Sequence, residues 1–251
     1  MSKKIDVHLL PEHCTAEQLR GGTAIVVDVL RASTTILTAL QNGAAGVIPC
    51  LSVEAAKAHR AADASVLLGG ERSGVIIDGF DLSNSPTDYS RTAVENRTIS
   101  YTTTNGTRAL LRCREARVVL IGAFSNAGRL ADYLTTCSQR LHIVCAGTDS
   151  EITGEDALFA GCLIDRILSS DCQQSQAILS DTASLVLGWW RFESSERPLV
   201  ASLMNTLGGK NLVDLSYTDD IKIAAEVDGR PVLAEFEATT GLITVSNADG
   251  I

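Results

Sequence analysis

The feature that most constrains the fold is an alternation of short apolar runs and helical patterns over the first 150 residues. Many of the runs are apolar throughout, which is typical of strands buried on both faces of a sheet. The predicted strands cover residues 5–10, 24–30, 46–49, 65–68, 99–104, 118–123 and 142–146, and the predicted helices cover 15–20, 34–41, 53–62, 108–113 and 127–137. This order predicts an α/β fold, a three-layer α/β/α arrangement with a mostly parallel or mixed sheet.

The pattern changes after residue 150. Helices are predicted from about residue 155 to 168 and across 174–190, followed by short strands at 222–227, 231–236 and 241–245. No linker or low-complexity stretch separates these parts. We therefore expect residues 1–251 to form a single domain, in which any lobes would span about 1–150 and 151–251.

Charge and composition exclude several classes of partner. The formal net charge is −9 and the pI is near 4.9, so neither nucleic acid nor an anionic membrane surface is expected as a partner. The sequence contains no run of about 18 apolar residues, so no membrane span is expected. The seven cysteines show no CxxC or zinc-ligand spacing, which favours reduced thiols in a cytoplasmic protein. An anionic small molecule would need local cations or a metal to offset the global charge.

The stretch "AIVVDVLRASTT" places Asp28 in an apolar run and follows it with Arg31, Ser33, Thr34 and Thr35. A buried carboxylate is costly unless it is paired or bound to a metal. Asp28 could cap the following helix or pair with Arg31. Three hydroxyls beside a guanidinium favour a phosphate-like ligand instead, because Arg supplies paired donors to such an oxyanion.

Three further stretches combine turns with charged or polar side chains. In "TTTNGTRAL", Asn105 and Gly106 form a turn dipeptide and Thr107 is a candidate helix cap. "GGERSG" presents Glu71 and Arg72, and "GEDALFAG" places Asp156 at a helix start. Each has a plain structural interpretation as a capped turn, a surface loop or a favourable first-turn charge. The functional interpretation is an anion-binding loop with oxygen ligands for Mg²⁺.

"HCTAEQLR" has the HCx5R form of cysteine-dependent phosphatases, with Cys14 as the candidate nucleophile. The interior "TAEQ" instead predicts a capping box that starts a helix at Thr15. A chance match is expected about 0.4 times in this composition, so the isolated motif decides little.

Taken together, the blocks "DVLRASTT", "GGER", "GFDLSNSP", "TTTNGTRAL", "GAFSN" and "CAGT…GEDALFAG", in this order, resemble the 2-phosphosulfolactate phosphatase (ComB-like) family. The resemblance covers roughly residues 4–161, and "GGKNLVDLSYTDDIKIAAEVD" matches the family's C-terminal block more loosely. It implies a three-layer α/β fold and a Mg²⁺-dependent phosphatase. The substrate would be 2-phospho-3-sulfolactate, an intermediate of coenzyme M synthesis, or a similar phospho-hydroxy acid.

The resemblance also implies roles for the residues in these blocks. Asp28 would be a Mg²⁺ ligand or nucleophile, with Glu71 and Asp156 as further metal ligands. Arg72 would face the sulfonate or carboxylate of the substrate. The phosphoryl group would be held by Arg31, Ser33, Thr34 and Thr35, and a second anion cradle would be formed by Asn105, Gly106 and Thr107. The alternatives are a non-catalytic protein that binds a phosphorylated metabolite and a phosphatase that uses Cys14; a homo-oligomer is compatible with each.

Overall fold

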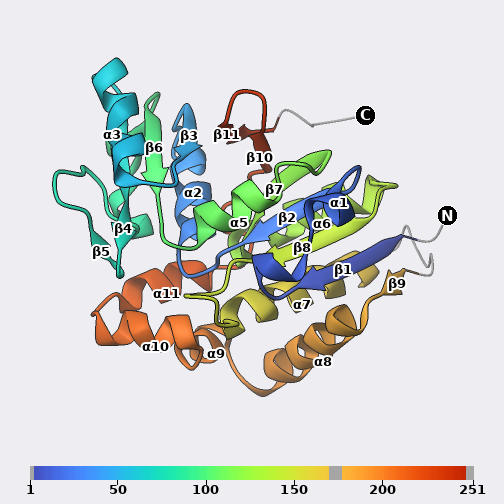
Figure 1. The fold of residues 1–251 in the computed structure, drawn as a ribbon. Coiled ribbons are helices and arrows are strands. Elements are labelled where there is room, and N and C mark those ends of the chain that lie inside the picture. Colours follow the sequence, from blue (N-terminus) through green and yellow to red (C-terminus); the bar gives the residue numbers. More distant parts are fainter. Residues whose placement is uncertain (1–2, 170–176, 247–251) are drawn as a thin grey trace.

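The computed structural model of the protein describes residues 3–169 and 177–246 (Figure 1). Its strands form a sheet in the order β5-β4-β6-β3-β11-β10-β7-β2-β8-β1-β9. The strands are β1 Lys4–His8, β2 Thr23–Val27, β3 Gly46–Pro49, β4 Leu67–Arg72, β5 Val75–Ile76, β6 Thr98–Thr102, β7 Val118–Gly122, β8 Leu141–Cys145, β9 Ile178–Leu179, β10 Ala234–Glu237 and β11 Leu242–Val245.

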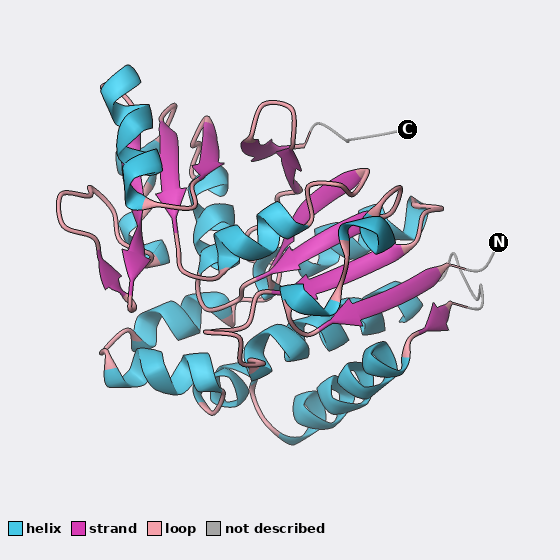
Figure 2. Ribbon diagram, in the orientation of Figure 1, coloured by secondary structure: helices cyan, strands magenta, loops and turns pink. Residues whose placement is uncertain are grey.

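Helices lie on both sides of the strands (Figure 2). The α-helices are α1 Ala16–Leu19, α2 Ala32–Gln41, α3 Val53–Ala62, α4 Arg91–Val94, α5 Gly106–Arg112, α6 Ala127–Thr136, α7 Gly154–Ser169, α8 Asp181–Glu196, α9 Leu199–Met204, α10 Leu207–Asp214 and α11 Thr218–Ala224. Short 3-10 turns cover Pro11–His13, Pro86–Asp88 and Phe124–Asn126. The predicted three-layer α/β/α class is confirmed.

The sheet consists of two parallel groups joined by an antiparallel hairpin. Strands β4, β6 and β3 are mutually parallel, as are β7, β2, β8, β1 and β9. The hairpin β10–β11 lies between them and pairs antiparallel with β7 on one side and β3 on the other. The last strands of the chain therefore sit in the middle of the sheet, which makes it mixed.

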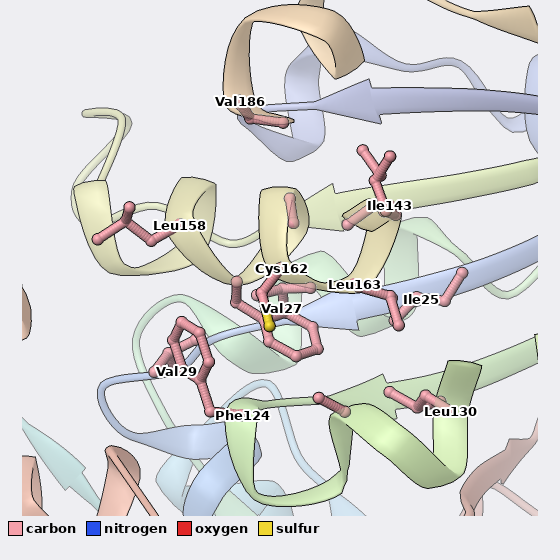
Figure 3. Packing of buried hydrophobic residues seen from close by; sticks show 14 of the residues in the cluster. Ile25, Val27, Val29, Phe124, Leu130, Ile143, Leu158, Cys162, Leu163 and Val186 are labelled. Atoms are coloured by element: carbon pink, nitrogen blue, oxygen red, sulfur yellow. The ribbon is translucent and has the colours of Figure 1, made fainter. Parts of the chain in front are cut away.

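Two large apolar clusters hold the layers together. One packs β1, β2, β7 and β8 against α6, α7 and α8, and Figure 3 shows part of it around Val27, Phe124, Leu158 and Leu163. The other buries α2 and α5 against strands of both parallel groups and the hairpin. Accordingly, α2 packs against β3 of one group and β7 of the other, and α5 packs against β2. Both helices follow strands whose ends carry candidate site residues.

Most predicted elements are confirmed with shifts of a few residues at their ends, and the strand Gly46–Pro49 matches its prediction fully. The predicted strand at 222–227 is wrong, because residues Thr218–Ala224 form α11 with Asp219 and Asp220 in its first turn. Part of the helix predicted across 174–190 lies outside the described residues, and α8 begins only at Asp181. Among the described residues, no helix is both long and apolar enough to span a bilayer.

Candidate active site

A cavity of about 470 Å³ lies where several strands end. The register aligns the last residues of β2, β7 and β8, since Val27 pairs with Gly122 and Cys145. In the other group Gly70 pairs with Thr102, which sets Glu71 and Thr103 next to each other. The lining comprises Asp28, Leu30, Arg31, Glu71, Ser73, Gly74, Asn84, Thr103, Thr104, Asn105, Thr148, Asp149, Gly208, Asn211, Leu212, Asp214 and Leu215.

Asp28 follows β2 directly and lines this cavity. Its Oδ1 accepts a hydrogen bond of 3.3 Å from the backbone N–H of Ala32, at the start of α2. A Cβ at Gly106 would stand only 2.6 Å from Asp28 Oδ2 and 2.8 Å from Ala32 Cβ. A glycine at position 106 is therefore required by the close approach of the carboxylate.

The pKa of Asp28 is raised from 3.8 to about 7. Desolvation by burial is the main cause, and repulsion from Glu71 and Glu155 adds to it. Hydrogen bonding from Ala32 and the charge of Arg31 act in the opposite direction. A cation close to Asp28 would lower this raised pKa, because it would favour the ionised form of the carboxylate.

Arg31 lines the same cavity but has fixed partners on its other sides. One terminal nitrogen donates to Asp220 Oδ2 at 2.8 Å and the other donates to the carbonyl of Gly74 at 2.7 Å. Its guanidinium carbon lies 4.5 Å from the ring centre of Tyr217, a cation–π distance. Pairing of Asp28 with Arg31 was one alternative from the sequence, and in the structure Arg31 pairs with Asp220 instead.

Glu71 is buried at the cavity wall, at the end of β4. Its Oε1 accepts from the N–H and hydroxyl of Thr104, and its Oε2 accepts from the N–H of Gly74. Arg72, the next residue, donates to the Glu71 carbonyl and to the Thr102 hydroxyl and is not among the cavity residues. The structure thus brings Glu71 to Asp28 and Arg31 but does not bring Arg72 there.

The hydroxyls of Ser33, Thr34 and Thr35 lie in the first turn of α2, buried and outside the cavity lining. Ser33 Oγ accepts from the Asp28 N–H, Thr34 donates to the Val29 carbonyl and Thr35 donates to the Asn84 carbonyl. These bonds shape the turn that carries Asp28 and Arg31. Direct contact between these hydroxyls and phosphate stays a prediction.

The loop after β6 contributes polar groups from Thr103 to Asn105, just before α5. Asn105 Oδ1 accepts from the Asp149 N–H at 3.3 Å, which joins this loop to the one after β8. Gly106 and Thr107 lie behind Asp28, around a buried space of about 10 Å³. The hydroxyls of Thr103 and Thr107 are both buried at this space without a hydrogen-bond partner in the structure.

Asp156 is buried in the first turn of α7 and does not line the cavity. Its oxygens accept from the N–H groups of Val29, at 2.9 Å, and Gly147, at 3.2 Å, so it fastens the loop after β2 to the loop after β8. Burial raises the pKa of Asp156 well above its usual range, with repulsion from Asp28 and Glu155 adding to the shift. Its role as a metal ligand stays a prediction.

Cys14 lies outside the cavity lining and is buried. Its thiol donates to the Pro11 carbonyl at 3.4 Å, and burial raises its pKa, which opposes formation of a thiolate nucleophile. The adjoining capping box is confirmed, because Thr15 and Gln18 exchange both hydrogen bonds. The HCx5R match therefore describes a helix start.

The charge of the cavity is mainly acidic. Over residues 3–169 and 177–246, its lining contains one guanidinium, that of Arg31, and the carboxylates of Asp28, Glu71, Asp149 and Asp214. Among these same residues, no three His, Cys, Asp or Glu side chains are close enough to share one metal ion. An ion held here would take one or two carboxylates and complete its shell with water and ligand oxygens, the arrangement that Mg²⁺ favours.

Sequence reasoning did not single out Asp220, Thr103 or Asn211. Asp220 is 189 positions from Arg31 in the chain, and no local pattern links the two. Glu155 directly precedes Asp156 and raises the pKa of Asp28, and its buried Oε2 has no hydrogen-bond partner among the described residues. Both carboxylates of "GEDALFAG" lie in the first turn of α7.

Comparison with known proteins agrees with the resemblance seen in the motifs. The model of the 2-phosphosulpholactate phosphatase family matches residues 8–239. The chain belongs to this family. A probable 2-phosphosulfolactate phosphatase of Clostridium perfringens (strain 13 / Type A) is 42% identical over 184 residues, 72% of this chain and 73% of the relative. One of Clostridium novyi (strain NT) is 36% identical over 235 residues, 93% and 97% of the two chains.

The match therefore includes the C-terminal part of the chain. A probable 2-phosphosulfolactate phosphatase of Symbiobacterium thermophilum (strain DSM 24528 / JCM 14929 / IAM 14863 / T) is 38% identical over 223 residues, 88% of this chain and 94% of the relative. The family match to residue 239 therefore includes α10, which lines the cavity, and α11, which carries Asp220.

Proposed function

We propose that this protein is a Mg²⁺-dependent phosphatase that hydrolyses 2-phospho-3-sulfolactate, or a closely similar phospho-hydroxy acid, to the hydroxy acid and inorganic phosphate. Membership of the family and the names of its relatives support the reaction. We further propose that the reaction is a step of coenzyme M biosynthesis in the cytoplasm.

The observation that carries the proposal is the charge around Asp28. A phosphorylated sulfolactate carries phosphate, sulfonate and carboxylate groups, whereas the cavity presents Asp28 and Glu71 beside Arg31. Carboxylates adjoin phosphate oxygens favourably only when a cation lies between them. The oxygen donors of Asp28 and Glu71 suit a hard cation. Burial is the main cause of the raised pKa of Asp28, and a cation beside this carboxylate would favour its ionised form.

Asp28 and Glu71 are the residues that would hold Mg²⁺. When bound, the ion would neutralise charge on the phosphoryl oxygens and bring the ester against Asp28. Arg31 binds the phosphoryl oxygens through the N–H groups that its protein partners leave free, which stabilises the charge that develops during transfer. Asn105 and Asn211 also line the cavity, and their side-chain amides would donate to the other anionic groups of the substrate. Phosphoryl transfer consists largely of such positioning and charge stabilisation.

The test is release of inorganic phosphate from 2-phospho-3-sulfolactate by the purified protein, with Mg²⁺ and with excess EDTA. We expect multiple turnovers with Mg²⁺, loss of activity in EDTA and recovery when Mg²⁺ is restored. Lactate 2-phosphate, which lacks the sulfonate, is the matched control for substrate class. Binding without phosphate release would favour a non-catalytic metabolite-binding protein, and release that survives EDTA would contradict the metal requirement.

A further inference from the structure

Arg31 lines the cavity from the loop after β2, and Tyr217 and Asp220 of the C-terminal part of the chain contact its guanidinium. We propose that Asp220 and Tyr217 are positioning residues, which hold the Arg31 guanidinium in the orientation that binds the phosphoryl group of the substrate. This inference rests on the proposed function for the identity of the substrate. It assigns a role to a segment of the chain that contributed no candidate residue at the level of sequence.

The contacts around Arg31 fix its guanidinium on several sides. Asp220 accepts from one terminal nitrogen at 2.8 Å, and both side chains of this ion pair are 2% exposed. The Gly74 carbonyl accepts from the other terminal nitrogen at 2.7 Å. A guanidinium carries five N–H donors in one rigid plane, so these two bonds leave the others for a ligand in the cavity that Arg31 lines.

Asp220 is itself held in place. Its Oδ1 accepts from the Ser85 hydroxyl at 2.5 Å, while its Oδ2 accepts from Arg31. It lies in the first turn of α11, and Tyr217 precedes that helix with its ring 4.5 Å from the Arg31 guanidinium carbon. The carboxylate and the ring therefore come from one short segment, and together they set both the edge and the face of the guanidinium.

This arrangement also solves a problem of charge. Arg31 lines a cavity with Asp28 and Glu71, and its charge already favours the ionised form of Asp28. A freely rotating Arg31 would pair with one of these carboxylates and block both the cation and the phosphate. Asp220 supplies a competing carboxylate outside the cavity lining, which opposes pairing of the guanidinium with Asp28. A buried ion pair adds little net stability compared with apolar side chains. We therefore expect the Arg31–Asp220 pair to serve mainly to orient the guanidinium.

The experiment compares Asp220→Asn with Asp219→Asn, a matched control on the same helix whose exposed side chain pairs only with Lys222 in the structure. We expect Asp220→Asn to raise KM and the inhibition constant of inorganic phosphate by about tenfold or more, the usual effect of a lost charge-assisted hydrogen bond. Asp219→Asn should leave both unchanged. Unchanged constants in a folded Asp220→Asn variant would overturn the inference.

A double-mutant cycle separates positioning from a general structural role. If Asp220 acts through Arg31, Asp220→Asn should have no further effect on phosphate binding once Arg31 is replaced by Met. An equal loss in both backgrounds would overturn the inference.

A second pair of variants covers the case in which Asp220→Asn does not fold. Tyr217→Leu should weaken phosphate binding, whereas Tyr217→Phe should bind phosphate as the wild type does, because it keeps the ring. Equal affinities for these two variants would also count against the inference.

Phosphate binding is measured by calorimetry with Mg²⁺ present, so it does not depend on turnover. Suppose that the wild type binds phosphate more tightly than Asp220→Asn but releases no phosphate from the ester. This result would contradict the proposed function and support the inference. A wild-type protein that binds no phosphate would contradict both.

Discussion

Arg31 and Asp220 form a buried ion pair of 2.8 Å across 189 positions of the chain. The pair joins the loop after β2, which carries Asp28, to α11. A helix that does not line the cavity is therefore directly connected to Arg31, which does. Changes in α11 should reach the site through this contact.

Replacement of Asp28 by Asn should stabilise the fold above neutral pH. The folded-state pKa of Asp28 is about 7 against an ordinary value of 3.8, so ionisation opposes folding as pH rises. The stabilisation of the fold by neutral Asp28 is fully present below about pH 3.8 and is lost progressively between about pH 3.8 and pH 7. Thermal unfolding should show a gain of roughly 1–3 kcal/mol for Asp28→Asn at pH 8 and almost none at pH 3.5. A loss of stability at pH 8 would contradict this account of Asp28.

Binding of Mg²⁺ should strengthen as pH rises through about 7, because the ion requires ionised Asp28. Titration calorimetry at pH 6 and pH 8 measures the affinity, and buffers of different ionisation enthalpy report proton release. We expect about tenfold tighter binding at pH 8 and a net release of protons near pH 7. Affinity that is constant over this range would remove Asp28 from the metal site.

Gly106→Ala should destabilise the protein and lower its activity, because the added methyl would meet Asp28 Oδ2 at 2.6 Å and Ala32 Cβ at 2.8 Å. Overpacking of this kind costs about 1–3 kcal/mol. Gly188→Ala is the matched control: it lies within α8, and an added methyl there meets nothing within 4 Å. Chemical denaturation should show a gain of up to about 1 kcal/mol for the control. Equal effects of the two substitutions would argue against the close approach at Gly106.

Cys14→Ser should retain the wild-type kcat, because the thiol lies outside the cavity lining and burial raises its pKa. Steady-state kinetics before and after treatment with a thiol-modifying reagent would check this. A fall of a thousandfold in the folded variant would revive the cysteine-dependent mechanism.

The sequence predicted the parts of the fold that local pattern determines. Buried strands such as β2 and β8 are mostly apolar, and their ends were placed to within a few residues. The position of the β10–β11 hairpin in the middle of the sheet follows from pairing between distant segments, which local pattern does not encode. The run at 222–227 was misassigned because its apolar residues suit either a strand or the buried side of a short helix.

The candidate site shows the same division. Asp28, Arg31, Glu71 and Asn105 were found because each lies at or just beyond the carboxyl end of a predicted strand, and the structure brings all four to one cavity. The three hydroxyls after Arg31 belong to the turn itself, since the first turn of α2 directs them to backbone groups. Asp220 depends on a contact between distant parts of the chain and was missed.

The most direct test of the central claim is phosphate release from 2-phospho-3-sulfolactate at saturating Mg²⁺, measured side by side for the wild type and Asp28→Asn. The account predicts turnover by the wild type and a loss of at least about a thousandfold in kcat for the folded variant, as for groups that act directly on the reacting atoms. Turnover at the wild-type rate by Asp28→Asn would contradict the account, because it would remove the carboxylate around which this site is built.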